Sequence, residues 1–208
     1  MKKAKQTASY YNNQSHKYDR IYSSYLSHTH QKLLERLEIQ TGESVLDCSA
    51  GTGLLAEQLL KKFDVGRLLL NDPATDMLNV AKKKLNNKKL DIVYTHFFAE
   101  ELDELLPERF DHIVCLNSFH YYVDQERVVS NFKKLLKPGG TLWLLDWNRT
   151  GFFIINSMLI DWFSTMNINT RTLDETKSLL ESCGFSVNQK QAWRFRLWNF
   201  FYLKAALT

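Results

Sequence analysis

Short apolar runs alternate with longer amphipathic runs through the middle of the chain, and this alternation limits the possible folds more than any other feature. Five apolar runs have the length of buried strands, at residues 44–48, 67–71, 91–95, 110–116 and 141–146. Three runs between them repeat apolar residues at helical spacing, at 54–63, 76–85 and 124–136. Because strands separated by helices form right-handed crossovers, we expect an α/β domain whose mostly parallel sheet has helices on both faces.

The 208 residues contain no internal repeat and no dividing linker, so we expect a single domain over 1–208. Within it the pattern predicts a tyrosine-rich helical segment at 1–40, a core at 41–146, an amphipathic insert at 147–183 and final strands at 184–208. The turn Lys137-Pro138-Gly139-Gly140 ends the last core helix, because proline cannot continue a helix and glycine tolerates the turn.

Charge and cysteine usage argue against several classes of protein. Lys and Arg exceed Asp and Glu by only four, and the lysines are scattered rather than gathered on one basic face. Cys48, Cys115 and Cys183 lie far apart without a CxxC pair, which favours a reducing, cytoplasmic location over a disulfide framework or a metal site. The longest apolar stretch, 152–163, is too short to span a bilayer, and no apolar run follows the basic N-terminus as in a secretory signal.

A strand runs directly into a turn of small residues and then a helix at Val45-Leu46-Asp47-Cys48-Ser49-Ala50-Gly51-Thr52-Gly53. Small residues let a ligand approach the backbone, and the helix N-terminus offers unpaired N–H groups to an anion. Residues 51–56 also fit the dinucleotide fingerprint GxGxxG/A, with Asp72 about 20 residues further on. The pattern alone is compatible with a dinucleotide, with a cofactor of different charge, or with an ordinary strand–helix turn.

The charge of Asp47 separates the two kinds of cofactor. A pyrophosphate bound at this turn would lie beside the carboxylate and be repelled by it. S-adenosylmethionine has no phosphate, and it carries a cationic sulfonium, a cationic amino group and one carboxylate for the helix terminus. An acid at the start of the turn therefore favours S-adenosylmethionine.

Over residues 40–146 the chain resembles the class I S-adenosylmethionine-dependent methyltransferases, in the branch that includes the ubiquinone and menaquinone biosynthesis C-methyltransferases and many small-molecule enzymes. Residues 47–53 are similar to that family's first motif, DxGxGxG, with Ser49 in place of the first glycine. The acid in Asn71-Asp72-Pro73 and the turn at 137–140 complete the resemblance. It implies a doubly wound, Rossmann-like, seven-stranded and mostly parallel sheet, with an N-terminal helical lid and a helical insert after the fifth strand.

The resemblance also implies cofactor contacts at the strand ends. Asp72 would accept hydrogen bonds from both ribose hydroxyls, although Asp before Pro is also a common helix start signal. Phe98 stands where the family often has an acid, so the adenine would stack on an aromatic ring. Glu100 would either lie beside the adenine or belong to a solvated first turn of a helix. The expected cofactor-binding residues are Tyr18, Asp47, Ser49, Ala50, Gly51, Gly53, Asp72, Pro73, Met77, Phe98, Ala99, Glu100 and Asn117.

Methyl transfer requires that acceptor and methyl group be held close and aligned, with a base only where the acceptor loses a proton. His120 and Tyr121, beyond the fourth strand, are the candidate catalytic residues, as a base or as positioning groups. We expect the insert to cap the acceptor with Phe152, Phe153, Ile154, Ile155, Met158, Leu159, Trp162 and Phe163. This lining favours a small hydrophobic or aromatic acceptor, although the same residues would also suit a homodimer interface or a membrane surface.

Three other functions stay open at this point. A nucleic-acid methyltransferase would use the basic and aromatic run 193–198, but that run is expected in the last strands, and the Asn/Asp-Pro-Pro-aromatic tetrad is missing from the sequence. A non-catalytic protein that binds S-adenosylmethionine would fit the departures at Ser49 and Phe98. A dehydrogenase would bind NADH at the same turn.

Overall fold

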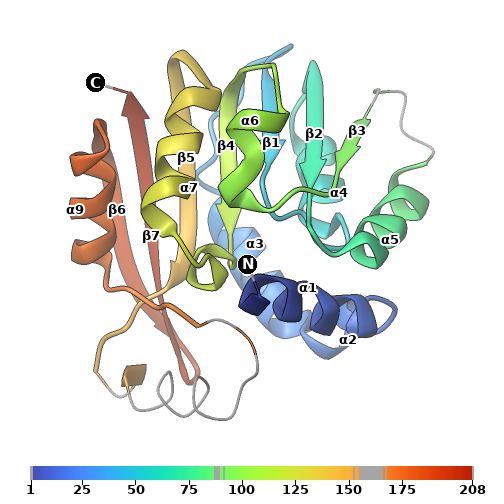
Figure 1. The fold of residues 1–208 in the computed structure, drawn as a ribbon, viewed down its shortest axis with the longest axis horizontal. Coiled ribbons are helices and arrows are strands. Elements are labelled where there is room, and N and C mark those ends of the chain that lie inside the picture. Colours follow the sequence, from blue (N-terminus) through green and yellow to red (C-terminus); the bar gives the residue numbers. More distant parts are fainter. Residues whose placement is uncertain are drawn as a thin grey trace.

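The computed structural model describes residues 2–86, 90, 92–151, 153–154, 166 and 168–207. They form a seven-stranded sheet in the order β3-β2-β1-β4-β5-β7-β6 (Figure 1). Neighbouring strands from β3 to β5 pair in parallel, and β7 runs antiparallel to β5 and β6. The strands are β1 (Ser44–Asp47), β2 (Arg67–Asn71), β3 (Ile92–Thr95), β4 (Phe110–Leu116), β5 (Leu136–Trp147), β6 (Phe185–Phe195) and β7 (Trp198–Leu207).

Helices cover both faces of the sheet (Figure 1). They are α1 (Lys2–Gln14), α2 (Tyr18–Ile21), α3 (Ser23–Leu34), α4 (Leu54–Lys62), α5 (Thr75–Leu85), η1 (Ala99–Glu101), α6 (Leu102–Leu105), η2 (Phe119–Tyr121), α7 (Gln125–Leu135) and α9 (Leu173–Ser182). Apolar side chains of α3, α4 and α5 share one buried cluster, and those of α6, α7 and α9 share another. The order of the strands reverses between β1 and β4, the place where open α/β sheets bind ligands at the carboxyl ends of their strands.

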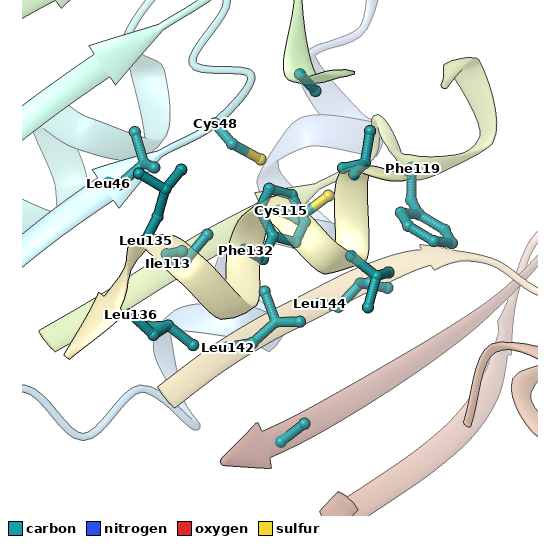
Figure 2. Close-up of a cluster of buried hydrophobic side chains, with 14 of the residues drawn as sticks. Leu46, Cys48, Ile113, Cys115, Phe119, Phe132, Leu135, Leu136, Leu142 and Leu144 are labelled. Carbon is teal, nitrogen blue, oxygen red and sulfur yellow. The ribbon is translucent and has the colours of Figure 1, made fainter. Parts of the chain in front are cut away.

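The two faces are filled by alternate residues of the same strands. Leu46, Ile113 and Leu144 point to the side of α7, whereas Val45 and Val114 belong to the cluster on the other side. Figure 2 shows the cluster on the side of α7, in which Phe132 and Leu135 of that helix lie over side chains of β1, β4 and β5. Because both faces are buried, these strands read in the sequence as nearly continuous apolar runs rather than as alternating ones.

The structure confirms the mostly parallel sheet, helices within residues 1–40 and the strand pair at the end of the chain. The turn at 137–140 differs from its prediction, because β5 already begins at Leu136 and the turn forms an irregularity within that strand. Phe110 pairs with Leu136 and His112 with Thr141, which leaves residues 137–140 opposite Asp111. Lys137 Nζ binds Asp111 Oδ2 at 2.7 Å across this irregularity.

The last part of the predicted insert at 147–183 contains α9, which begins with a capping box between Thr172 and Glu175. Most of the apolar side chains predicted to cap the acceptor, at 152, 155, 158, 159, 162 and 163, lie outside the described residues. Phe153 is buried beside Trp147, and Ile154 is 43% exposed. In the part of the chain that is described, no helix combines the length and the apolar character needed to cross a membrane.

Gly53→Ala is expected to destabilise the protein by roughly 2–4 kcal/mol. Gly53 precedes α4 with a positive φ of 70°, and an added Cβ would lie 2.8 Å from the Ala81 Cβ atom and 3.2 Å from its Cα atom. Gly42→Ala is the matched control, because its φ of 84° is also positive but nothing lies within 4 Å of the added Cβ. Urea unfolding should show a loss near 1 kcal/mol for the control, and equal losses would contradict the predicted close packing on α5.

Candidate functional site

A pocket lies at the carboxyl ends of the strands and is lined on one side by α1. Figure 1 shows α1 beside these strand ends. We call this pocket the apolar pocket. The turns after β1 to β4 supply one part of its wall, and α1 supplies another. Its lining residues are Ala4, Thr7, Ala8, Tyr11, Tyr18, Ser49, Gly51, Asp72, Pro73, Ala74, Met77, Phe98, Ala99, Glu100, Ser118, Tyr121 and Tyr122.

Asp72 links the turn after β1 to the turn after β2. Its Oδ2 accepts from the Gly51 N–H at 2.9 Å, and its Oδ1 accepts from the Ala74 N–H at 2.8 Å. Burial raises the pKa of Asp72 to about 6, against the lowering effect of these two N–H groups. The helix α5 starts at Thr75 with Ala74 as its N-cap, so Asp72 does not cap the helix. Each carboxylate oxygen keeps further acceptor capacity for a ligand.

Asn71, at the end of β2, joins the neighbouring turns on both sides. Its amide nitrogen donates to the carbonyl oxygens of Cys48 and Phe97, at 3.1 and 3.0 Å. Its amide oxygen accepts from Thr95 Oγ1 and from the Phe97 N–H, both at 3.0 Å. A fully buried and fully paired side chain therefore holds three strand ends in place around the pocket.

A second, more polar pocket adjoins the first and shares Tyr18, Ser49 and Gly51 with it. We call it the polar pocket. Its other lining residues are Leu26, His30, Asp47, Ala50, Thr52, Leu54, Leu55, Leu116 and Asn117. Asp47 is 4% exposed, and among the described residues its carboxylate accepts one hydrogen bond, a long one of 3.4 Å from the Ser49 N–H. Burial raises the pKa of Asp47 to about 7, and the nearby charge of Asp72 adds to the rise.

Ser49 replaces the glycine of the family motif, and its side chain bonds to the protein. Its Oγ lies 2.8 Å from the Tyr122 hydroxyl, which also lies 3.3 Å from Cys48 Sγ. The hydroxyl groups thus tie the turn after β1 to the turn after β4. The departure from the motif adds a hydrogen bond between two residues of the pocket lining.

The wall around Phe98 is apolar. Ala8, Ala74 and Met77 form a small buried cluster, against which Phe98 and the tyrosines Tyr11 and Tyr18 pack. Glu100 lies in the short helix η1, and its Oε1 accepts from the Val123 N–H at 2.9 Å. The Glu100 side chain therefore anchors the segment before α7.

The first two helices are tied to this site by polar contacts. The Tyr11 and Tyr121 hydroxyls lie 2.5 Å apart, and burial raises the pKa of both groups well above the usual range for tyrosine. Asp19 of α2 accepts from Thr52 Oγ1 at 2.5 Å and pairs with Lys84 Nζ at 2.7 Å. These contacts hold α1 and α2 over the strand ends, and the tyrosines stay protonated at neutral pH.

His120 lies behind Tyr121 and outside the linings of both pockets. Its Nδ1 donates to Asp146 Oδ1 at 2.5 Å, and its backbone N–H donates to Asp146 Oδ2 at 3.0 Å. The imidazole stacks on Trp147 with ring centroids 3.8 Å apart, and its centroid lies 4.0 Å from that of Tyr121. This arrangement fixes the Nδ1–H tautomer and packs His120 against the back of Tyr121.

All the expected cofactor-binding residues except Gly53 line one of the two pockets. Gly53 packs on α5 instead. The sequence reasoning missed Ala4, Thr7 and Ala8 of α1, as well as Ser118 and His30. Positions 4, 7, 8 and 11 of α1 lie on one face of a helix. This spacing would have identified Ala4, Thr7 and Ala8 as neighbours of Tyr11 on the face that lines the pocket.

Comparisons with known proteins point to one family. Residues 46–142 match the family described as "Methyltransferase domain". The chain is similar to a Ubiquinone biosynthesis O-methyltransferase of Coxiella burnetii, 31% identical over 57% of this chain and 49% of that protein. It is also similar to the Ubiquinone/menaquinone biosynthesis C-methyltransferase UbiE of Francisella tularensis subsp. novicida, 33% identical over 53% of this chain and 45% of that protein. The matches thus span about half the length of these relatives.

A solved S-adenosylmethionine-dependent methyltransferase from Mesorhizobium loti has the same fold. The TM-score is 0.71 at 17% sequence identity, and the alignment covers 85% of this chain and 96% of that one. The matched segment 46–142 runs from β1 into β5 and contains the turns that line both pockets. Residues 46–142 therefore match a methyltransferase domain family, and the chain shares the fold of that solved methyltransferase.

Proposed function

We propose that this protein transfers the methyl group of S-adenosylmethionine to a small hydrophobic or aromatic acceptor. One observation carries the choice of cofactor: neither Lys nor Arg is among the described residues lining the two pockets, whereas Asp47 and Asp72 both are. A dinucleotide pyrophosphate would meet two buried acids there without a side-chain cation. A cationic, phosphate-free cofactor instead gives both acids a favourable partner.

The residues present fit that cofactor. Asp72 has spare acceptor capacity for two ribose hydroxyls, because only one backbone N–H binds each of its oxygens. Met77, Phe98 and Ala99 supply an apolar wall for the adenine. A side chain at Gly51 would come within 3.4 Å of Met77 Cε, so glycine keeps that part of the pocket open. The name of the solved neighbour, an S-adenosylmethionine-dependent methyltransferase, supports the same cofactor.

When bound, S-adenosylmethionine supplies an activated methyl group with a neutral sulfur leaving group. The protein's part is to exclude water and to align the acceptor. Tyr11 and Tyr121 stay neutral, because burial raises the pKa of both hydroxyls, and these hydroxyls bond to each other beside the pocket. We assign His120 a positioning role, because its Nδ1 is held by Asp146 and its ring packs behind Tyr121.

The acceptor is proposed to enter between α1 and Tyr121. The lining of small and aromatic residues in that region, Ala4, Thr7, Ala8 and Tyr11, suits an apolar ring. The names of the relatives make ubiquinone precursors the first acceptors to assay.

Calorimetry with S-adenosylhomocysteine and with NADH tests the cofactor. We expect binding of S-adenosylhomocysteine only, and preference for NADH would overturn the proposal. Incubation with S-adenosylmethionine and phenolic quinone precursors should then release S-adenosylhomocysteine, in an amount equal to that of the methylated acceptor. Cofactor binding without turnover on any apolar or nucleic-acid acceptor would instead indicate a non-catalytic binding protein.

A further inference from the structure

Exposed apolar side chains gather at one place on the surface. Of the five large apolar side chains that are exposed among the described residues, three belong to segments that meet at Trp198: Ile21, Ile154 and Leu197. The Trp198 ring contacts the rings of Tyr25 and Phe153, with a centroid separation of 5.6 Å in each pair. Tyr25 follows Ile21 by four positions, and Phe153 directly precedes Ile154. Single exposed apolar residues are common, but a group of them indicates an interaction surface.

This group lies at the edge of the sheet that holds the apolar pocket. Trp147, at the carboxyl end of β5, pairs with Phe200, so the turn of the β6–β7 hairpin extends beyond the end of β5. Figure 1 shows this turn and α2 at the lower end of the molecule, toward which the parallel strands point. Whatever binds the exposed group therefore lies on the same side of the molecule as the pocket.

Three exposed arginines lie among these apolar side chains. Arg20 directly precedes Ile21, and Arg194 and Arg196 come just before Leu197. None of the three takes part in the ion pairs formed by the described residues. We call the six residues the docking edge: Arg20, Ile21, Ile154, Arg194, Arg196 and Leu197.

The carboxylate nearest to Arg20 in the sequence does not neutralise the docking edge. Asp19 is bound instead to Lys84 of α5, with Oδ2 and Nζ 2.7 Å apart. At the opposite edge of the sheet a cation and a carboxylate do pair, as Arg67 Nη2 and Glu108 Oε2 do at 2.6 Å. The docking edge thus presents cations that the described part of the chain leaves available to an outside anion.

The hairpin turn holds its cations in an unusual backbone conformation. Arg196 has a positive φ of 55°, a region that favours glycine over residues with a side chain. Its guanidinium carbon lies 5.2 Å from the centroid of the Phe195 ring, and Arg194 Nε donates to the Arg196 carbonyl oxygen at 2.9 Å. Leu197, the next residue, is 70% exposed. The turn therefore presents an apolar side chain close to two guanidinium groups.

The aromatic rings of the run 193–198 are engaged within the protein. Trp193 Nε1 donates to His28 Nε2 at 2.9 Å, and Phe195 stacks on the same imidazole with centroids 3.8 Å apart. Trp198 packs against Trp147, with ring centroids 4.9 Å apart. Single-stranded nucleic acids are bound by exposed aromatic rings on which the bases stack. Here the exposed apolar side chains are aliphatic, and this arrangement favours a lipid surface over a nucleic acid.

We infer that the docking edge binds the surface of an anionic membrane. Its leucine and isoleucines enter the boundary between headgroups and acyl chains, and its arginines contact the lipid phosphates. The consequence for catalysis rests on the proposed function: the protein takes its hydrophobic acceptor from the bilayer, because the apolar pocket lies at the same edge of the sheet. Docking itself is measured without cofactor or acceptor, so the two ideas fail separately.

Co-sedimentation with vesicles tests the docking. Wild-type protein should bind vesicles of equal parts phosphatidylcholine and phosphatidylglycerol, and bind vesicles of phosphatidylcholine alone much more weakly. Binding to the anionic vesicles should weaken as salt is added, because salt screens exposed charges. Equal binding to both kinds of vesicle, or binding to neither, would overturn the inference. A preference for single-stranded poly-uridine RNA over the anionic vesicles would assign the edge to nucleic acid instead.

Removing the two hairpin arginines should weaken binding to the anionic vesicles. Arg194→Gln with Arg196→Gln is expected to lower the affinity about fivefold for each arginine, or about 30-fold in all. The matched control is Lys83→Gln with Lys133→Gln, which removes the same charge from exposed positions in the last turns of α5 and α7. If the two double variants lose affinity equally, net charge and not the docking edge is responsible.

The position of the hairpin turn can be followed by fluorescence. An added tryptophan in Leu197→Trp should shift its emission to shorter wavelength on anionic vesicles and be quenched by lipids with brominated acyl chains. Leu105→Trp is the control, because Leu105 is 46% exposed at the end of α6, which leads into the start of β4. Quenching of equal strength in both variants would contradict insertion of the turn.

The source of the acceptor is tested by kinetics. With an apolar quinone precursor dissolved in anionic vesicles, Arg194→Gln with Arg196→Gln should raise the apparent KM by the same factor as it weakens vesicle binding. With a short, water-soluble precursor, the same variant should keep the wild-type kcat and KM. A KM that is unchanged with the vesicle-bound precursor, despite weaker vesicle binding, would show that the acceptor does not come from the bilayer.

Discussion

Asp72→Ala is expected to weaken the binding of S-adenosylhomocysteine by roughly 1–3 kcal/mol, or about 5- to 150-fold. The side chain is buried, and both of its oxygens are oriented by the backbone N–H groups of Gly51 and Ala74. The variant therefore loses an oriented, charged acceptor for two ribose hydroxyls. Calorimetric titration at pH 8, where the carboxylate is ionised, measures the loss.

A ligand with altered ribose separates this effect from a general loosening of the turn. Wild-type protein should bind S-adenosylhomocysteine more tightly than its 2′-deoxy analogue, and Asp72→Ala should bind the two nearly alike. Asp76→Ala is the control, because Asp76 lies in the first turn of α5 but lines neither pocket. If Asp72→Ala keeps the wild-type preference for the ribose hydroxyl, the ribose assignment is wrong.

Asp47→Asn is expected to have opposite effects on affinity and on stability. At pH 8 the variant should bind S-adenosylhomocysteine about 10- to 100-fold more weakly, because the ammonium group loses its anionic partner. Its free energy of unfolding without ligand should rise by roughly 1–3 kcal/mol, because a buried and poorly paired carboxylate is removed. Thermal and urea unfolding of both proteins measure the second effect.

The sign of the stability change follows from the direction of the pKa shift. The folded protein raises the pKa of Asp47 to about 7, so this group favours folding at low pH and loses that contribution as the pH rises through 7. The advantage of Asp47→Asn should therefore shrink as the pH falls below 7. A stability difference that stays constant from pH 8 to pH 5 would contradict a buried and poorly paired carboxylate at Asp47.

The same group should make the binding of the cofactor depend on pH. A proton competes with the ammonium for Asp47, so wild-type affinity for S-adenosylhomocysteine should fall about tenfold between pH 8 and pH 6. Asp72, with a pKa raised to about 6, adds a smaller loss in the same direction. Titrations of Asp47→Asn across this range should show only that smaller loss, and an equally steep decline would assign the effect to another group.

The local chemistry of the chain was enough to predict much of the candidate site. The turns after β1 and β2 read directly from 47–53 and from Asn71-Asp72-Pro73, since a parallel sheet brings the carboxyl ends of neighbouring strands to one edge. The exception was Gly53, which packs against Ala81 of α5 instead of lining a pocket. A glycine in a motif shows that space is short, but the motif does not say which neighbour occupies it.

Residues contributed by distant helices were beyond local reasoning. The Tyr122 hydroxyl, for example, bonds to Ser49 of the turn after β1, 73 positions away in the sequence. His30 gave no signal, because it stands in a run of polar residues, 27–32, in which nothing marks one side chain as facing a pocket. Its place in the lining of the polar pocket emerges only when the fold brings α3 beside Asp47 and Asn117.

The sequence by itself determined the succession of strands and helices along the chain and the mostly parallel sheet, because both follow from the periodicity of apolar residues. It also determined the two acids at the carboxyl edge of the sheet, because each belongs to a turn that directly follows a strand. Tertiary structure alone decided how α1 and α3 complete the two pockets and which hydrogen bonds orient Asp72 and Asn117. It also decided the unusual protonation of Asp47, since a pKa near 7 arises from burial among residues far apart in the chain.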